Sequence, residues 1–161
     1  MLFPTHLVAA PLLRGASGLS LFWLAVGAAL PDVIDKPLGM VGVVDLYHSV
    51  GHSLALLVVV VPVALYSRAG LAAAVGWGSH LLLDTVHVVV NGRPGDSLFL
   101  TWPVVVPANP PRIPPGEFVW HYLGTPSFFL ETVLWVVLAV VLVGRHRGFV
   151  SARTDPGSDR S

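Results

Sequence analysis

The chain has 161 residues, of which 54% are hydrophobic and only 11% charged, and its formal net charge is zero. Soluble domains carry roughly 25% charged residues, so this composition argues against a water-soluble domain and favours an integral membrane protein. A neutral chain without an extended basic segment also lacks the electrostatic footprint of a nucleic-acid-binding protein. Since the chain has no cysteine, imidazole and carboxylate groups are the only strong metal ligands that it offers.

Apolar stretches predict an all-α integral membrane bundle of four to five short helices. In chain order the stretches are Leu2–Leu13, Leu19–Leu30, Leu54–Tyr66, Leu71–Val90 and Phe128–Val143. A helix that crosses ~30 Å of hydrocarbon needs about 20 apolar residues, so only the fourth stretch is long enough without its flanks. Pro31 and Pro37 follow the second stretch and are expected to end it in a turn.

Residues 1–150 are predicted to form one membrane-embedded helical metal-binding domain. Within it, residues 91–127 carry eight of the fourteen prolines and are expected to be a loop that covers one face of the bundle. Residues 151–161 are predicted to be a disordered polar tail. In an up-and-down multi-pass arrangement in the cell membrane, most arginines fall on one side, which the positive-inside rule makes cytoplasmic.

The same arrangement gathers histidines and carboxylates on the opposite, non-cytoplasmic side. His80, Asp84 and His87 stand at positions i, i+4 and i+7, and His48 and His52 are four apart, so each set is expected to line one helical face. Ionisable groups inside a span cost roughly 2.5 to 3.5 kcal/mol each on insertion scales, so clustered ones are expected to pair, bind an ion or face water. The predicted metal ligands are His6, Asp32, Asp35, His52, His80 and Asp84, with His48 and His87 as additional candidates.

Other interpretations of these residues stay open. Asp32 and Asp35 equally suit a polar turn between two prolines after a helix. A histidine and an aspartate in an apolar run, such as His80 and Asp84, are also typical of a proton relay or an ion pathway. His121, taken alone, is interpreted as a packing residue.

The proline-rich loop carries further aromatic and basic residues, which can roof the site and contact a substrate head group. These residues are Trp102, Arg112, Trp120 and His121.

An ordered set of short motifs resembles the YdjM-like family of membrane-bound metal-dependent hydrolases. The motifs, which cover roughly residues 1–107, are Thr5 and His6; Leu30, Pro31, Asp32 and Asp35; His52 and Ser53; His80 and Asp84; and Gly92, Trp102 and Pro103. The chain departs from the family around His48, where it is one residue shorter and lacks an arginine, and at His87, where the family often has threonine. The resemblance also suggests kinship with the all-helical zinc-dependent phospholipase C and nuclease fold, and that kinship implies phosphoester hydrolysis.

The sequence therefore predicts a membrane-bound hydrolase in which a divalent metal, zinc in the first place, activates water for attack on a phosphoester. Asp32 or Glu131 is the predicted general base. A site at this depth favours an amphiphilic or lipid-linked substrate among the membrane lipids, and no feature of the sequence defines an oligomeric state. The alternatives are a protein that conducts protons or metal ions, and a non-catalytic membrane scaffold whose polar cluster only holds helices together.

Overall fold

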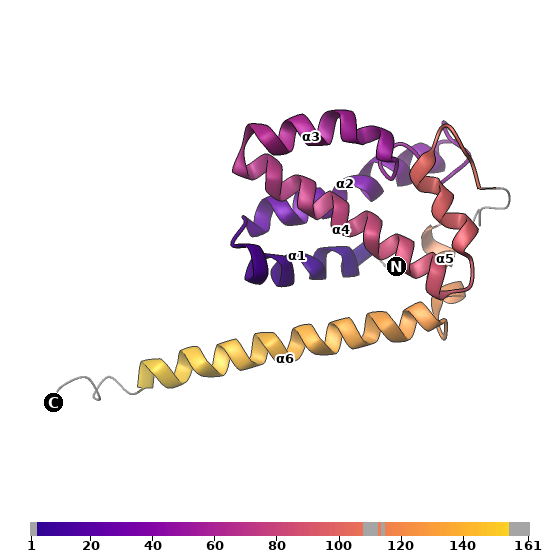
Figure 1. Cartoon of the computed structure of the whole chain (residues 1–161). Coiled ribbons are helices and arrows are strands. Elements are labelled where there is room, and N and C mark those ends of the chain that lie inside the picture. The colour runs from indigo at the N-terminus through magenta and orange to yellow at the C-terminus, as the bar shows by residue number, and fades with distance from the viewer. Residues whose placement is uncertain (1–2, 108–112, 114, 155–161) are drawn as a thin grey trace.

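A computed structural model describes residues 3–107, 113 and 115–154, and within these ranges the chain forms helices and no strand (Figure 1). The α-helices are α1 (Phe3–Ser17), α2 (Leu21–Met40), α3 (Leu57–Tyr66), α4 (Arg68–Val90), α5 (Pro115–Tyr122) and α6 (Pro126–Thr154). Two 3-10 helices, η1 (Leu54–Leu56) and η2 (Pro94–Thr101), lie directly before α3 and shortly after α4. The predicted all-α fold class is confirmed.

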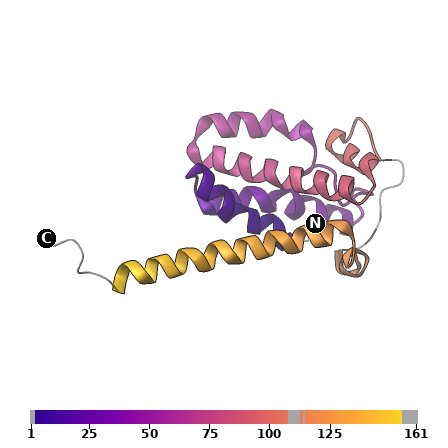
Figure 2. The same cartoon turned by 60° about the horizontal axis from the view of Figure 1, so that its bottom comes forward.

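Helices α2 and α4 form the centre of the bundle, with α1 on one side and α3 on the other (Figures 1 and 2). The two central helices approach closely because each presents a glycine to the other's backbone. A Cβ atom on Gly27 would lie 1.9 Å from the carbonyl oxygen of Ala73, and one on Gly76 would lie 2.1 Å from that of Leu24. Any side chain at either position would push the two helices apart.

Two small apolar clusters surround this contact. The first is formed by Ala10, Leu19, Leu24 and Ala72, and the second by Trp77, Leu81 and Phe99. Trp77 of α4 also donates a hydrogen bond of 2.9 Å from Nε1 to the carbonyl oxygen of Gly51. This bond fastens the irregular loop of residues 41–53 to the central helix.

The predicted turn at Pro31 is wrong, because α2 continues through both Pro31 and Pro37 to Met40. A proline inside a helix removes a backbone donor and normally costs about 3 kcal/mol. Packing against α4 offsets this cost in α2, since these two helices share the most extensive contact in the bundle. Asp32 and Asp35 are consequently helical residues, and their spacing of three places them on adjoining parts of one helical face.

The predicted loop over residues 91–127 is in part helical. Proline is favoured in the first turn of a helix, where a backbone donor has no partner to lose, and Pro94, Pro115 and Pro126 are the first residues of η2, α5 and α6. The proline-rich composition therefore marks helix starts as well as loops. Helix α6 also extends to Thr154, so residues 151–154 of the predicted disordered tail are helical, while residues 155–161 lie outside the described ranges.

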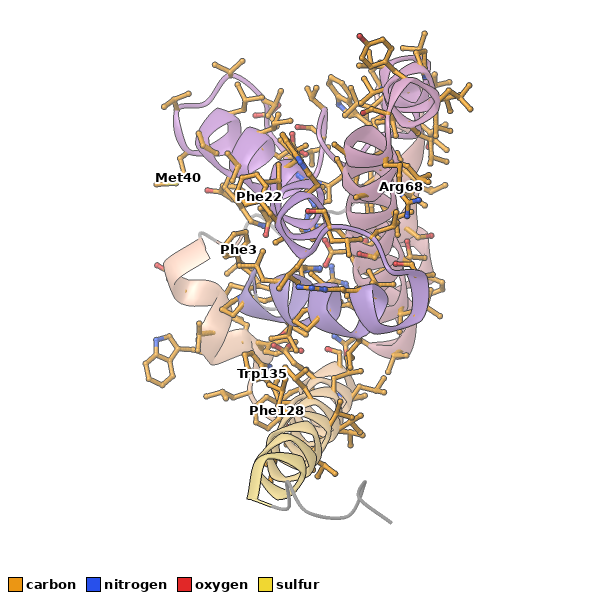
Figure 3. The ribbon with its side chains drawn as sticks, turned by 90° about the vertical axis from the view of Figure 1, so that its left-hand side faces the viewer. Phe3, Phe22, Met40, Arg68, Phe128 and Trp135 are labelled. Atoms are coloured by element: carbon orange, nitrogen blue, oxygen red, sulfur yellow. The ribbon has the colours of Figure 1, made fainter. Side chains whose placement is uncertain are left out.

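Two of the described helices are long and apolar enough to cross a membrane, namely α4 and the segment Pro126–Gly144 of α6. Helix α6 runs alongside the bundle and then extends beyond it (Figure 2). Its Trp135 lies on the side that faces α1, whereas Phe22 and Met40 of α2 point away from the bundle and are 66% and 69% exposed (Figure 3).

Candidate metal centre

A buried carboxylate, Asp84 of α4, lies among four imidazoles from different parts of the chain. Its Oδ1 atom is 3.3 Å from Nε2 of His6 on α1. Its Oδ2 atom is 3.2 Å from Nε2 of His80, 3.3 Å from Nε2 of His52 and 3.4 Å from Nε2 of His48. Imidazoles from α1, from the loop before η1 and from α4 therefore meet at one carboxylate.

The ligand atoms around Asp84 form three overlapping groups, and within each group all atoms lie within 4.8 Å of one another. The groups are His6, His80 and Asp84; Asp32, His52 and His80; and His48, His52 and Asp84. Imidazole nitrogen and carboxylate oxygen are ligands that zinc and similar divalent cations accept. These buried groups could hold such a cation.

Hydrogen bonds on the far side of two rings determine which nitrogen faces the cluster. Nδ1 of His80 lies 2.6 Å from the carbonyl oxygen of Ala28, which can only accept, so Nδ1 carries the proton. Nδ1 of His52 lies 2.7 Å from Oδ2 of Asp35. The two Nε2 atoms are thereby directed at each other, 3.0 Å apart. This is the outer support that metal-binding histidines usually have.

Asp35 supports the loop of residues 41–53, which carries His48 and His52 and is called the ligand loop below. Asp35 itself belongs to none of the three ligand groups. Its carboxylate accepts hydrogen bonds from the backbone nitrogens of Ser49 at 2.6 Å, Gly51 at 2.8 Å and His52 at 3.3 Å. Burial alone would lower the pKa of His52, but the hydrogen bonds to Asp35 and Asp84 raise it. Asp35, a predicted ligand, therefore holds a ligand in place.

His48 and His52 do not line a helical face, and that prediction is wrong. They lie in the irregular loop before η1, which wraps around the Asp35 carboxylate. The ring of His48 packs against Phe99, with centroids 5.3 Å apart, and against His52 at 4.4 Å. Loop hydrogen bonds and ring packing, rather than helical periodicity, bring these two imidazoles to the cluster.

Asp32 lies between a lysine and two imidazoles of the cluster. Its Oδ1 atom is 3.1 Å from Nζ of Lys36 and 3.7 and 4.0 Å from Nε2 of His52 and His80. The ammonium group partly balances the carboxylate charge. Sequence reasoning missed Lys36, although its position four residues after Asp32 is the usual spacing of a helical ion pair.

Besides Asp35, two predicted site residues lie outside these ligand groups. His87 packs its ring near Phe118 and Tyr122, at centroid distances of 5.9 and 5.4 Å. Glu131 is buried on α6 and accepts hydrogen bonds from the hydroxyl groups of Thr5 and Tyr122. Burial and the neighbouring Glu131 carboxylate raise the pKa of Tyr122, so its hydroxyl group keeps the proton that it donates.

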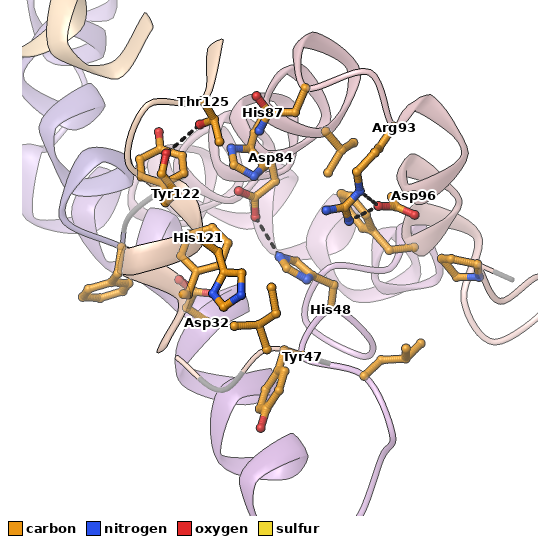
Figure 4. A pocket seen from close by; sticks show the side chains of 18 of the residues that line it. Asp32, Tyr47, His48, Asp84, His87, Arg93, Asp96, His121, Tyr122 and Thr125 are labelled. Carbon is orange, nitrogen blue, oxygen red and sulfur yellow. Dashed lines mark hydrogen bonds and ion pairs between the residues drawn. The ribbon is translucent and has the colours of Figure 1, made fainter. Parts of the chain in front are cut away.

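A cavity of about 450 Å³ opens beside the cluster (Figure 4). Asp32, His48 and Asp84 line it, and so does His87. Apolar wall residues include Phe3, Leu46, Val88, Phe99 and Phe118, and the basic residues of the wall are Lys36, Arg93 and His121. The cavity therefore joins the ligand cluster to a mixed apolar and cationic surface.

Of the four residues predicted to roof the site, one lines the cavity in the part of the chain that the structure describes. His121 of α5 lines the cavity, whereas Trp102 and Trp120 are not among the described residues that do so, and Trp120 is 76% exposed. Arg112 lies outside the described residues.

Ser53 has a structural role. Its hydroxyl group donates a hydrogen bond to the carbonyl oxygen of Trp102 and so joins the ligand loop to the segment after η2.

Comparisons of the chain with protein-family models, with curated proteins and with solved structures found no match. The functional argument consequently rests on the geometry of the residues themselves.

Proposed function

We propose that this protein is a membrane-embedded, metal-dependent hydrolase that acts on an amphiphilic phosphoester. The observation that carries the proposal is the convergence of buried imidazoles on Asp84, next to a cavity that Asp84 itself lines. A concave, largely apolar site with a few convergent polar groups is the usual form of a small-molecule site.

The donor set fits zinc or a similar divalent cation. Two imidazoles, of His52 and His80, have their Nδ1 atoms engaged elsewhere and direct their Nε2 atoms to one point, while two carboxylates supply negative charge. The residues that would hold the metal are His6, His48, His52, His80 and Asp84. When bound, such a cation lowers the pKa of a coordinated water to about 7 and polarises a phosphoryl oxygen.

The cavity wall suits a substrate with an anionic head and an apolar tail. Lys36 presents a half-buried ammonium group near Asp32, and Arg93 presents a more exposed guanidinium group paired with Asp96. Both can bind phosphoryl oxygens, for which charge-assisted hydrogen bonds are strong. Phenylalanine and aliphatic side chains of the same wall would cover the tail.

Asp32 is the carboxylate best placed to accept a proton from an attacking water, because it lies at both the cluster and the cavity. Glu131, the other predicted base, does not line the cavity among the described residues and is engaged by two hydroxyl groups. We therefore assign the base to Asp32.

A position within the membrane agrees with the surfaces of the helices. Helix α4 and the segment Pro126–Gly144 meet the length and composition of a span, and only 17% of the α6 window is buried inside the protein. Helix α3 has no buried residue and exposes a run of valines and leucines. Lipid would cover these faces, in a multi-pass arrangement with the site on the non-cytoplasmic side, as the distribution of arginines favours.

Elemental analysis of detergent-purified protein tests the proposal first. We expect near-stoichiometric zinc or another transition metal in the wild type and in Asp45→Asn, whose exposed carboxylate lies in the ligand loop outside the cluster. The double variant His80→Ala, Asp84→Ala should lose the metal. The loaded wild type should then hydrolyse short-chain phospholipid in micelles. A folded wild type that neither retains nor reloads metal would disprove the proposal.

A second candidate function is the conduction of protons or metal ions. It is favoured by one observation. Asp84 belongs to α4, a helix long enough to span a membrane, and its carboxylate lies near four imidazoles. Liposome flux separates the two functions, since a conduction site exchanges its ion rapidly, whereas a catalytic site retains the metal through purification.

A further inference from the structure

His121 occupies a part of the cavity wall that the ligand cluster does not use. It lies on α5 and is exposed, and Figure 4 shows it among the side chains that line the cavity. Its Nδ1 atom is 3.2 Å from the carbonyl oxygen of Glu117, which can only accept, so Nδ1 donates that bond. No described residue forms a hydrogen bond with Nε2, which leaves this atom free to exchange a proton with a bound molecule or with water.

The imidazoles of the cluster direct Nε2 at the ligand positions and so are not the proton donors to a substrate. Those of His52 and His80 have Nδ1 engaged by Asp35 and by Ala28, and their Nε2 atoms face the ligand positions. His6 is 1% exposed and directs Nε2 at the Asp84 carboxylate. His48 lines the cavity, but its Nε2 atom lies 3.4 Å from Oδ2 of Asp84.

His87 lines the cavity but is less accessible than His121. Its ring packs near Phe118 and Tyr122, and its Nδ1 atom is buried with no hydrogen-bond partner. A group that gives up a proton in every turnover must regain one from solvent, and exposed His121 meets that need.

Helix α5 is fastened to the rest of the molecule next to His121. The following residue, Tyr122, is 1% exposed and donates its hydroxyl proton to Glu131 of α6. The same hydroxyl lies 3.0 Å from the carbonyl oxygen of Ser127. These contacts hold the end of α5, and with it the His121 backbone, at the cavity.

We propose that His121 is the general acid of the reaction and protonates the oxygen of the leaving alcohol. The inference rests on the proposed phosphoester hydrolysis. A water oxygen forms a bond to phosphorus while its proton passes to Asp32. The bond from phosphorus to the leaving oxygen breaks with its electron pair, and that oxygen takes the proton from Nε2 of His121. The imidazole then regains a proton from solvent, and Asp32 releases its proton to solvent.

Two substrates that differ only in their leaving group test this assignment. Dodecyl 4-nitrophenyl phosphate releases a stabilised phenolate that needs no acid, whereas dodecyl methyl phosphate must expel an alkoxide. Production of dodecyl phosphate is measured for zinc-loaded wild type, His121→Gln and Trp120→Ala. The last variant changes an exposed residue of the same helix that is not among the described residues lining the cavity.

General acid catalysis contributes about 10²- to 10⁴-fold, so His121→Gln should lower the ratio of kcat/KM for the methyl ester to that for the nitrophenyl ester by at least about 100-fold. Trp120→Ala should leave this ratio unchanged. A His121→Gln variant that loses activity on both esters equally would overturn the assignment, because a merely structural role affects both. If the metal-loaded wild type hydrolyses neither ester, the proposed function itself fails and His121 has no leaving group to protonate.

Discussion

Replacing Asp35 with asparagine separates a supporting role of this residue from a role as metal ligand. The asparagine side chain has nearly the same shape but only one acceptor oxygen, whereas the carboxylate accepts bonds through Oδ2 from His52 and through Oδ1 from Gly51. One of these donors would therefore face an amide NH₂ group. Removing a partner behind a metal-binding histidine typically lowers metal affinity 10- to 100-fold, which corresponds to about 1.4 to 2.7 kcal/mol.

The assay is competition for zinc between a chromogenic chelator and the detergent-solubilised protein. Asp35→Asn should still bind the wild-type amount of metal, but with a dissociation constant about 10- to 100-fold higher. Asp45→Asn removes an exposed carboxylate from the neighbouring loop and should bind as the wild type does. Complete loss of metal from a folded Asp35→Asn protein would refute the reasoning and make Asp35 a direct ligand. An unchanged dissociation constant would refute it in the other direction.

Two further predictions concern pH and helix packing. Because the pKa of His52 is raised from 6.5 in the folded metal-free protein, protonated His52 stabilises the fold below that value. This stabilisation is lost as the pH rises through the raised pKa, so the difference in metal-free Tm between wild type and His52→Gln should shrink over that range while zinc affinity increases; a difference that grows with pH would contradict this. Gly27→Ala places Cβ 1.9 Å from the Ala73 oxygen and should destabilise by about 1 to 3 kcal/mol in detergent unfolding. Gly78→Ala meets open space and should stabilise by up to about 1 kcal/mol, and equal effects of the two changes would be contrary evidence.

The parts of the site that could be predicted from the sequence are those that depend on the spacing of residues within one helix. His80 and Asp84 are four residues apart in a long apolar run, and this spacing places both on one side of α4, as the structure has them. Helices α1, α2, α3, α4 and α6 could also be predicted, because each overlaps one of the five apolar stretches. Such features depend on neighbours a few residues away in the chain.

The remaining parts depend on contacts between distant segments. The different roles of Asp32 and Asp35 arise because α2 continues through Pro31, which only its packing against α4 explains. The position of His52 depends on the loop that closes around Asp35. The cavity wall formed by α5 lies in a proline-rich segment whose composition suggested a loop.

The cluster around Asp84 joins segments that are far apart in the sequence. His6 belongs to α1, and His80 and Asp84 belong to α4, so a cation held by these three residues would connect the first and fourth helices at a single point. A link of this kind acts on the unfolded chain as a cross-link does, because it restricts the chain between residue 6 and residue 84, and the entropy removed grows with the logarithm of that separation. Chelation would then lower the free energy of unfolding of the protein, and the refolding rate would depend on the concentration of free metal.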